Sequence, residues 1–101
     1  MNMLKLLKSL FGEPVNYKEL LETGAVVIDF RTTPEFNAGH LNNSENIPLE
    51  TLFLKFDRII NKEVIVVCKP GARAARAKAI LKQNGIVAHN AGAWQNLSSF
   101  E

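Results

Sequence analysis

The chain has 101 residues, of which 47% are hydrophobic and 22% charged, and its formal charge is +2 at pH 7. This composition is typical of one ordinary globular domain and excludes a disordered or fibrous protein. The slight positive excess argues against nucleic acid as a partner but is compatible with small anions.

The first twelve residues, MNMLKLLKSLFG, predict an amphipathic leader helix, and residues 13–101 then form the main domain. Lys5 and Lys8 interrupt any signal-peptide core, so we expect the leader to be retained. We expect it to dock on its own domain or on a second copy, with weak membrane-surface contact by residues 1–11 as the alternative. No apolar run approaches the roughly 20 residues that cross a bilayer. The apolar residues on one face of the leader are Met3, Leu4, Leu6, Leu7, Leu10 and Phe11.

The start of the main domain predicts a short helix followed by a buried strand. Asn16 and Glu19 have capping-box spacing, which indicates a helix from there through about Glu22, and Gly24 ends it. The segment AVVIDF at 25–30 is apolar and rich in β-branched residues up to the polar Asp29. This pattern is typical of a parallel strand that is covered on both faces.

The next segment predicts two helices separated by a loop. We expect Thr33 to be the N-cap and Pro34 the first residue of one or two helical turns that Gly39 closes. The sequence LNNSENIP at 41–48 is typical of a turn-rich loop. An amphipathic helix is expected over 49–60. Its apolar residues at helical spacing are Leu52, Phe56, Ile59 and Ile60.

The last third of the chain predicts two strands, each followed by a helix. EVIVV at 63–67 is continuously apolar, and the strong helix formers at 72–84 precede Gly85 at the position of a left-handed cap. A third strand is expected at 86–90, then a turn and a short helix at 94–97. Strands that alternate with helices predict an α/β fold, with a small parallel β-sheet flanked by helices and the extra N-terminal helix.

The only cysteine, Cys68, follows the second strand directly. Ligands of open α/β sheets bind at the carboxyl ends of strands, and the amide groups of the next helix start can surround one point there. Gly71 permits a close backbone approach, while Lys69 and Arg73 add positive charge. Because such surroundings stabilise a thiolate, we interpret Cys68 as a nucleophile. The alternative is a buried cysteine that only fills the core.

Two motifs resemble those of the rhodanese (sulfurtransferase) family. CKPGAR at 68–73 is similar to the active-site loop of that family, with a glycine three residues and an arginine five residues after the cysteine. The stretch VIDFRTTPEFNAGHLNNSENIPL at 27–49 is similar to its upstream signature of Asp-x-Arg, Pro-Glu-Phe, Gly-His and Asn-Ile-Pro. The resemblance covers about 13–97. Asn43 stands where the family usually has glycine, and asparagine tolerates a left-handed backbone.

The resemblance implies a sulfurtransferase that needs no metal ion or other cofactor. The Cys68 thiolate would take the outer sulfur of thiosulfate or a persulfide donor, hold it as a persulfide, and pass it to cyanide or to a thiol such as thioredoxin or glutathione. Asp29 and Arg31 are expected to position the loop in a polar network in which Arg31 pairs with Glu35. A lone thiol suits a reducing, cytoplasmic location. The expected substrate-binding residues of the loop are Lys69, Pro70, Gly71, Ala72 and Arg73.

Two other functions compete with this interpretation. Related phosphatases and arsenate reductases use a Cys-x5-Arg loop, but here Ala74 occupies the position of that arginine. A rhodanese-like module that only binds a partner is the second alternative, and the retained cysteine with its basic loop argues against it. We expect His40 to satisfy backbone groups rather than to act as a base.

Overall fold

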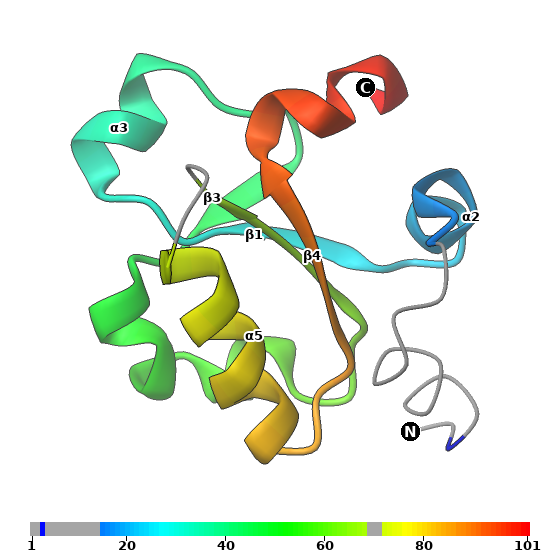
Figure 1. The fold of residues 1–101 in the computed structure, drawn as a ribbon, viewed down its shortest axis with the longest axis vertical. Helices are drawn as coiled ribbons and strands as arrows, with labels where there is room; N and C mark the ends of the chain where they lie inside the picture. Colours follow the sequence, from blue (N-terminus) through cyan, green and yellow to red (C-terminus); the bar gives the residue numbers. More distant parts are fainter. Residues whose placement is uncertain (1–2, 4–14, 69–71) are drawn as a thin grey trace.

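A parallel sheet of four strands runs through the middle of the molecule in the order β2-β1-β3-β4 (Figure 1). The computed structural model describes residues 3, 15–68 and 72–101. The strands are β1 (Val26–Asp29), β2 (Ser44–Asn46), β3 (Val64–Cys68) and β4 (Ala88–Ala93). The expected α/β fold with a small parallel sheet is therefore confirmed.

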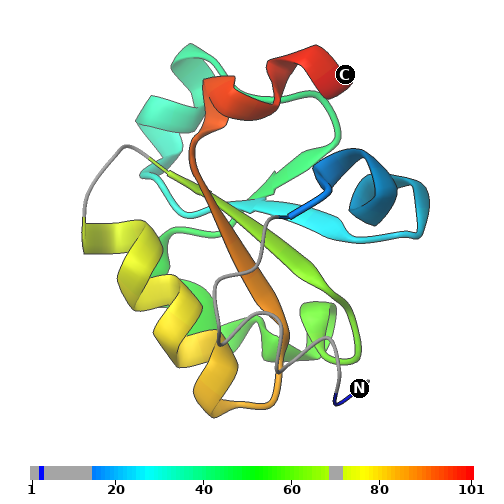
Figure 2. The ribbon, with the colours of Figure 1, turned by 45° about the vertical axis from the view of Figure 1, so that its right-hand side comes forward.

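Helices cover both faces of this sheet, and Figure 2 shows α5 and α2 on opposite sides of it. The helices are α2 (Tyr17–Glu22), α3 (Thr33–Ala38), η1 (Leu49–Leu54), α4 (Phe56–Ile59), α5 (Ala72–Gln83) and η2 (Trp94–Phe100), where η marks a 3-10 helix. One apolar core joins α5, η1 and α4 to the sheet face that carries Val64 and Val66. A second core joins α2 and η2 to the face that carries Ile65 and Val67.

Strand β3 is buried along its whole length. It pairs with β1 on one side and β4 on the other, and the two apolar cores cover its faces. Side chains alternate between the faces of a strand, so Val64, Val66 and Cys68 belong to the core under α5. The continuously apolar sequence of β3 is thus explained by burial on both faces.

The predicted ends of α2 and α5 are confirmed. The Asn16 side chain accepts a hydrogen bond from the Glu19 amide at 3.0 Å, and α2 ends at Glu22. Gly24 then takes a positive φ of 99°. Gly85 likewise takes a φ of 75° two residues after the end of α5, which glycine adopts without steric cost.

The loop predicted at 41–48 is wrong in part, because it contains the edge strand β2. Asn43 takes the left-handed conformation expected of it, with a φ of 62°, and turns the chain alongside β1. Ser44 then pairs with Val27, and Asn46 pairs with Asp29. An edge strand forms backbone hydrogen bonds with one neighbouring strand only and is partly exposed, so it tolerates polar residues. Turn propensity alone predicts a loop for such a segment.

Strand β4 extends three residues beyond the segment predicted at 86–90, to Ala93. The expected turn is instead an irregularity inside the strand, where the register against β3 shifts between Val66 and Val67. Gly92 accommodates this bulge with a φ of 75°. The closing helix that follows is a 3-10 helix and reaches Phe100.

The prediction of a single amphipathic helix over 49–60 is also wrong. The chain forms the 3-10 helix η1, breaks at Lys55, and then makes the four-residue α4. Leu49 and Leu52 are buried three residues apart, which matches the three residues per turn of a 3-10 helix. Ile60, expected on the apolar face, is 55% exposed.

The N-cap of α3 is Thr32 and not the predicted Thr33. Thr32 and Glu35 form a capping box, in which the Thr32 hydroxyl accepts from the Glu35 amide and the Glu35 carboxylate accepts from the Thr32 amide at 3.0 Å. This reciprocal pair needs a Glu three residues after the cap, so it selects Thr32 over its neighbour. Pro34 consequently lies one position further into the helix.

Changing Thr32→Ala is expected to lower the free energy of unfolding by about 1 kcal/mol, because the Glu35 amide at the start of α3 loses the Thr32 hydroxyl that accepts its hydrogen bond. Urea unfolding at pH 7 measures the change. Thr32→Ser keeps the hydroxyl and should stay within a few tenths of a kcal/mol of the wild type. An equal loss in both variants would contradict the capping role.

The predicted leader and the boundary at residues 12 and 13 lie outside the described residues, except for Met3, whose surface is 75% exposed. The division into 1–12 and 13–101 therefore stays a prediction. Within the part of the chain that the structure describes, we find no helix with the length and apolar character needed to span a bilayer.

Candidate active site

The carboxyl ends of β1 and β3 place the main sequence-predicted site residues side by side. Asp29 ends β1 and is in register with Val67, and Cys68 is the next residue and the last of β3. Cys68 has no exposed surface and belongs to the core between the sheet and α5. The expected position of the cysteine at a strand end is therefore correct, and its complete burial agrees with one feature of the core-filling alternative.

Asp29 and Arg31 form a buried ion pair at this edge of the sheet. The Arg31 Nε donates to Asp29 Oδ1 at 2.9 Å, and Nη2 donates to Oδ2 at 2.7 Å. The Arg31 backbone amide donates to the same carboxylate at 3.0 Å. The predicted contact of Arg31 with Glu35 is a hydrogen bond to the Glu35 backbone oxygen, whereas the ion pair of Arg31 is made with Asp29.

Arg31 also joins three other parts of the site. Its guanidinium donates to the backbone oxygens of Glu35 at 3.3 Å and Gly39 at 2.7 Å, and it lies 5.6 Å from the centre of the Trp94 ring. Hydrogen bonds to Asp29 raise the pKa of Arg31 above its usual value, although burial opposes this shift. Electrostatic interactions with Asp29, Glu35 and Cys68 also raise this pKa.

Close packing around Gly39 supports this arrangement. A β-carbon built on Gly39 would lie 3.3 Å from a carbon of the Trp94 ring, which is tighter than most contacts of this kind. The glycine therefore lets Trp94 approach the backbone segment that accepts a hydrogen bond from Arg31. We expect this contact to hold η2 against the end of α3.

Arg73 pairs with Glu35 across the gap between α5 and α3. The Arg73 Nη1 lies 3.0 Å from Glu35 Oε1, and Nη2 lies 3.3 Å from Oε2. The hydrogen bonds to Glu35 raise the pKa of Arg73 against the effect of burial, and an electrostatic interaction with Cys68 contributes to the increase. The side chain that the sequence assigns to substrate binding is thus held by a carboxylate.

The structure brings Cys68, Arg73, Asp29 and Arg31 to one edge of the sheet. Three predicted loop residues, at 69–71, lie outside the described residues, and Ala72 is the first residue of α5. Sequence reasoning did not find the link from Glu35 to α5. Its signal was present in the Pro-Glu-Phe motif, where the glutamate both caps a helix and pairs with a cation.

Ala74, at the position of the phosphatase arginine, is buried against the sheet. Arg76, one turn away from the cysteine loop, is exposed. Position 74 therefore supplies no arginine that could close around a tetrahedral oxyanion. This geometry disfavours the phosphatase alternative.

The two histidines lie outside this cluster. The His40 Nδ1 is 2.7 Å from the Phe36 oxygen, and its ring stacks on the Phe36 ring, as expected of a structural residue. His89 instead contacts Glu63, with 2.9 Å between Nε2 and Oε2. Within the described residues, no group of three or more His, Cys, Asp or Glu side chains is arranged to hold a metal ion.

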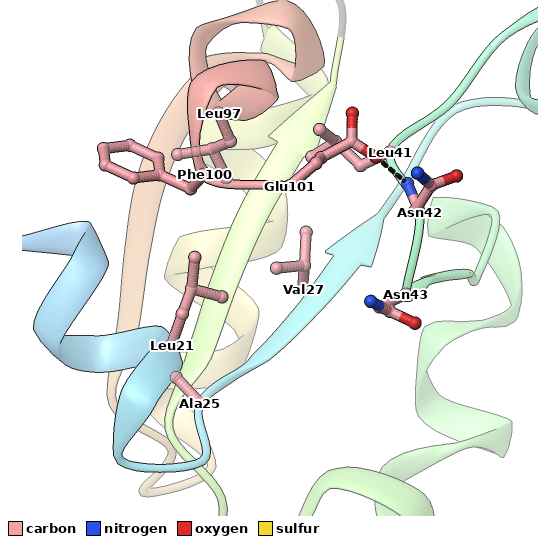
Figure 3. Close-up of a pocket in the computed structure, with 9 residues that line it drawn as sticks. All are labelled: Leu21, Ala25, Val27, Leu41, Asn42, Asn43, Leu97, Phe100 and Glu101. Atoms are coloured by element: carbon pink, nitrogen blue, oxygen red, sulfur yellow. Dashed lines mark hydrogen bonds between the residues drawn. The ribbon is translucent and has the colours of Figure 1, made fainter.

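A cavity of about 270 Å³ lies on the opposite face of the sheet, next to α2 and η2 (Figure 3). Its walls include Val27, Leu41 and Leu97, which belong to the second core. The Glu101 carboxylate accepts a hydrogen bond from the Asn42 amide at its rim. Because Cys68 faces the other core, this cavity is separate from the candidate active site.

The fold and the position of Cys68 define an α/β domain in which a cysteine ends the central strand and a helix begins four residues later. The family model described as Rhodanese-like domain matches residues 13–99. The chain therefore belongs to the rhodanese-like domain family.

Curated relatives match only part of the chain and are longer proteins. A Bacillus subtilis (strain 168) protein, uncharacterized protein YqhL, is 37% identical over 62 residues, which are 60% of this chain and 49% of the relative. The tRNA uridine(34) hydroxylase of Salmonella newport (strain SL254) is 31% identical over 68 residues, which are 60% of this chain and 19% of the relative. The chain thus spans about a fifth to a half of the length of these relatives.

Solved structures share the same fold. The reduced CoADR-RHD of Bacillus anthracis is 26% identical with a TM-score of 0.68, over 81% of this chain and 15% of that one. A rhodanese-like domain protein from Staphylococcus aureus is 25% identical with a TM-score of 0.65, over 94% of this chain and 84% of that one. The second match shows that this fold also makes up most of a short solved chain.

Proposed function

We propose that this protein is a sulfurtransferase that carries sulfur as a persulfide on Cys68. The observation that supports this most is the position of Cys68 at the end of β3, within electrostatic reach of Arg31 and Arg73. Its membership of the rhodanese-like domain family points to the same chemistry. Thiosulfate is the donor that we propose first, with a persulfide as the alternative donor.

The proposed reaction has two displacement steps. The Cys68 thiolate attacks the outer sulfur of thiosulfate, the bond between the two sulfur atoms of the donor breaks, and sulfite leaves with the electron pair. Cyanide or an acceptor thiolate then attacks the terminal sulfur of the Cys68 persulfide and releases the Cys68 thiolate. The acceptor becomes thiocyanate or a persulfide, so no oxidant or reductant is required.

Electrostatics around Cys68 support the first step. Burial in an apolar core disfavours a thiolate, so a reactive Cys68 needs compensating charge. Arg31 and Arg73 supply it, because each guanidinium is attracted by the Cys68 thiolate and this attraction is mutual. We propose that the amide groups of the loop at 69–71 add to this effect at the start of α5.

The remaining roles are proposed from the same arrangement. The loop residues Lys69, Pro70, Gly71 and Ala72 would surround the donor, and the Asp29–Arg31 pair would hold the loop in place from β1. A thiol such as thioredoxin or glutathione is the proposed acceptor. We further propose a cytoplasmic location, where a single cysteine remains a thiol.

Treating the protein with thiosulfate and measuring its mass tests this proposal. Cys68 is expected to gain one sulfur atom, and dithiothreitol should remove it because a thiol accepts the outer sulfur. Peptide mapping assigns the added mass to a residue. A chain that gains no sulfur from thiosulfate or from glutathione persulfide would contradict the proposal.

The complete burial of Cys68 favours a second candidate, a rhodanese-like module that binds a partner without catalysis. In that case the native protein should take up no sulfur, while Cys68 in the urea-unfolded chain should still react with a thiol reagent. The same mass measurement therefore separates the two candidates.

A further inference from the structure

We propose that Glu35 is a positioning residue that weakens the attraction of the Cys68 site for anions, because its carboxylate holds the Arg73 guanidinium. The inference rests on the proposed function of Cys68 as the reacting group. It adds a residue outside the cysteine loop that tunes which donors the site accepts.

The contact between Glu35 and Arg73 is close and bidentate. Both terminal nitrogens of Arg73 reach the Glu35 carboxylate, at 3.0 and 3.3 Å. The Arg73 side chain is 34% exposed and the Glu35 side chain 22% exposed, so water screens the pair only in part. Arg73 lies in the first turn of α5, and Glu35 lies in the first turn of α3. The ion pair thus ties the helix that follows Cys68 to the helix that follows β1.

Among the described residues, two ion pairs act on Cys68. Arg31 is paired with Asp29, and Arg73 is paired with Glu35, so each of the two guanidinium groups that attract the thiolate has its own carboxylate partner. A dianionic donor such as thiosulfate would be attracted by the arginine and repelled by the carboxylate of each ion pair. Removing the Glu35 charge should therefore strengthen the pull of Arg73 on an anion.

Glutamine is a suitable replacement for Glu35 because its oxygen can keep the contacts of Oε1 with Thr32 and Arg73, while the hydrogen bond from Arg73 Nη2 to Oε2 is lost together with the charge. Glu35 accepts hydrogen bonds from the amide and hydroxyl of Thr32 as part of the capping box. Glutamine also serves at this position of a capping box, and its oxygen can still accept from Arg73. Glu35→Gln therefore removes the charge while α3 keeps its cap.

Alkylation by two reagents that differ in charge measures the field at Cys68. Iodoacetate is an anion and iodoacetamide is neutral, so the ratio of their rate constants at one pH reports the attraction of the site for anions. In Glu35→Gln this ratio is expected to rise by about threefold to tenfold, the range for a partly screened charge. The KM for thiosulfate should fall in parallel.

Two further variants make the assignment specific. Glu19→Gln removes the same charge from the first turn of α2, which packs on the second core. It should leave the ratio of the two alkylation rate constants unchanged. Arg73→Gln should lower the ratio, and adding Glu35→Gln to it should raise the ratio by less than Glu35→Gln does in the wild type, because the part of the effect that is exerted by holding Arg73 is already lost. Urea unfolding of each variant confirms that it is folded.

The outcomes separate this inference from the proposed function. An unchanged or lower ratio in Glu35→Gln overturns the inference, even if Cys68 still takes sulfur from thiosulfate. If Glu35→Gln slows alkylation by iodoacetate and by iodoacetamide to the same extent, the inference is also overturned. A residue that acts only through packing would affect the two reagents alike. If Cys68 in the native protein reacts with neither reagent, the inference and the proposed function both fail. A higher ratio in a protein that gains no sulfur overturns the proposed function alone.

Discussion

Changing Cys68→Ser is expected to reduce thiocyanate formation from thiosulfate and cyanide by at least about a thousandfold, since the covalent route loses its nucleophile. A serine hydroxyl remains un-ionised at neutral pH and cannot hold the transferred sulfur as a persulfide. Steady-state assays at pH 8 measure the loss, and mass spectrometry should show no added sulfur in the variant.

The control for this variant concerns its fold, because Cys68 is completely buried beneath α5. Serine places a more polar group than a thiol in this core, whereas Cys68→Ala places no polar side-chain group there. Both variants should unfold cooperatively in urea, and both should be inactive. Substantial activity in either folded variant would show that another group transfers the sulfur.

Changing Asp29→Asn is expected to lower the free energy of unfolding by about 3 to 5 kcal/mol, the cost of leaving one partner of a buried ion pair without its counter-charge. The Asp29 side chain has no exposed surface, and it accepts hydrogen bonds from the Arg31 amide and guanidinium. Asparagine keeps one acceptor oxygen but loses the charge. Urea unfolding at pH 7 measures the difference.

A double variant distinguishes the charge effect from simple loss of packing. Asp29→Leu with Arg31→Met removes both charges, so no uncompensated cation remains in the interior. This variant should be more stable than Asp29→Asn. If Asp29→Asn costs less than about 1 kcal/mol, the pair behaves like a surface salt bridge and does not anchor this edge of the sheet.

Strands β1 and β3 and the helix after Cys68 were predictable because their hydrophobic and capping patterns are local. The continuous apolar runs of β1 and β3 indicated burial on both faces, and the helix formers of α5 ended at a glycine suited to a left-handed cap. The same reasoning failed for β2, whose three polar residues form a strand only because β1 offers a free edge. Edge pairing is a tertiary interaction that propensity does not register.

The polar network of the site shows the same limit. The motif residues Asp29, Arg31, Glu35 and Arg73 were all visible in the sequence, but their pairing was not. Spacing along the chain allowed Arg31 to pair with Glu35, because residues four apart are neighbours on a helix. In the structure, Arg31 lies before α3 rather than on it, so it reaches back to Asp29 and leaves Glu35 to Arg73.

The amino-acid sequence by itself determined that Cys68 ends a buried parallel strand and precedes a helix, since side-chain periodicity and capping preferences act over a few residues. Only the tertiary structure decided how deeply Cys68 is buried and which carboxylate holds each arginine. Those outcomes depend on how α3 and α5 approach each other beyond the end of the sheet. That approach joins Glu35 to Arg73, which are far apart along the chain, so no single stretch of the chain encodes it.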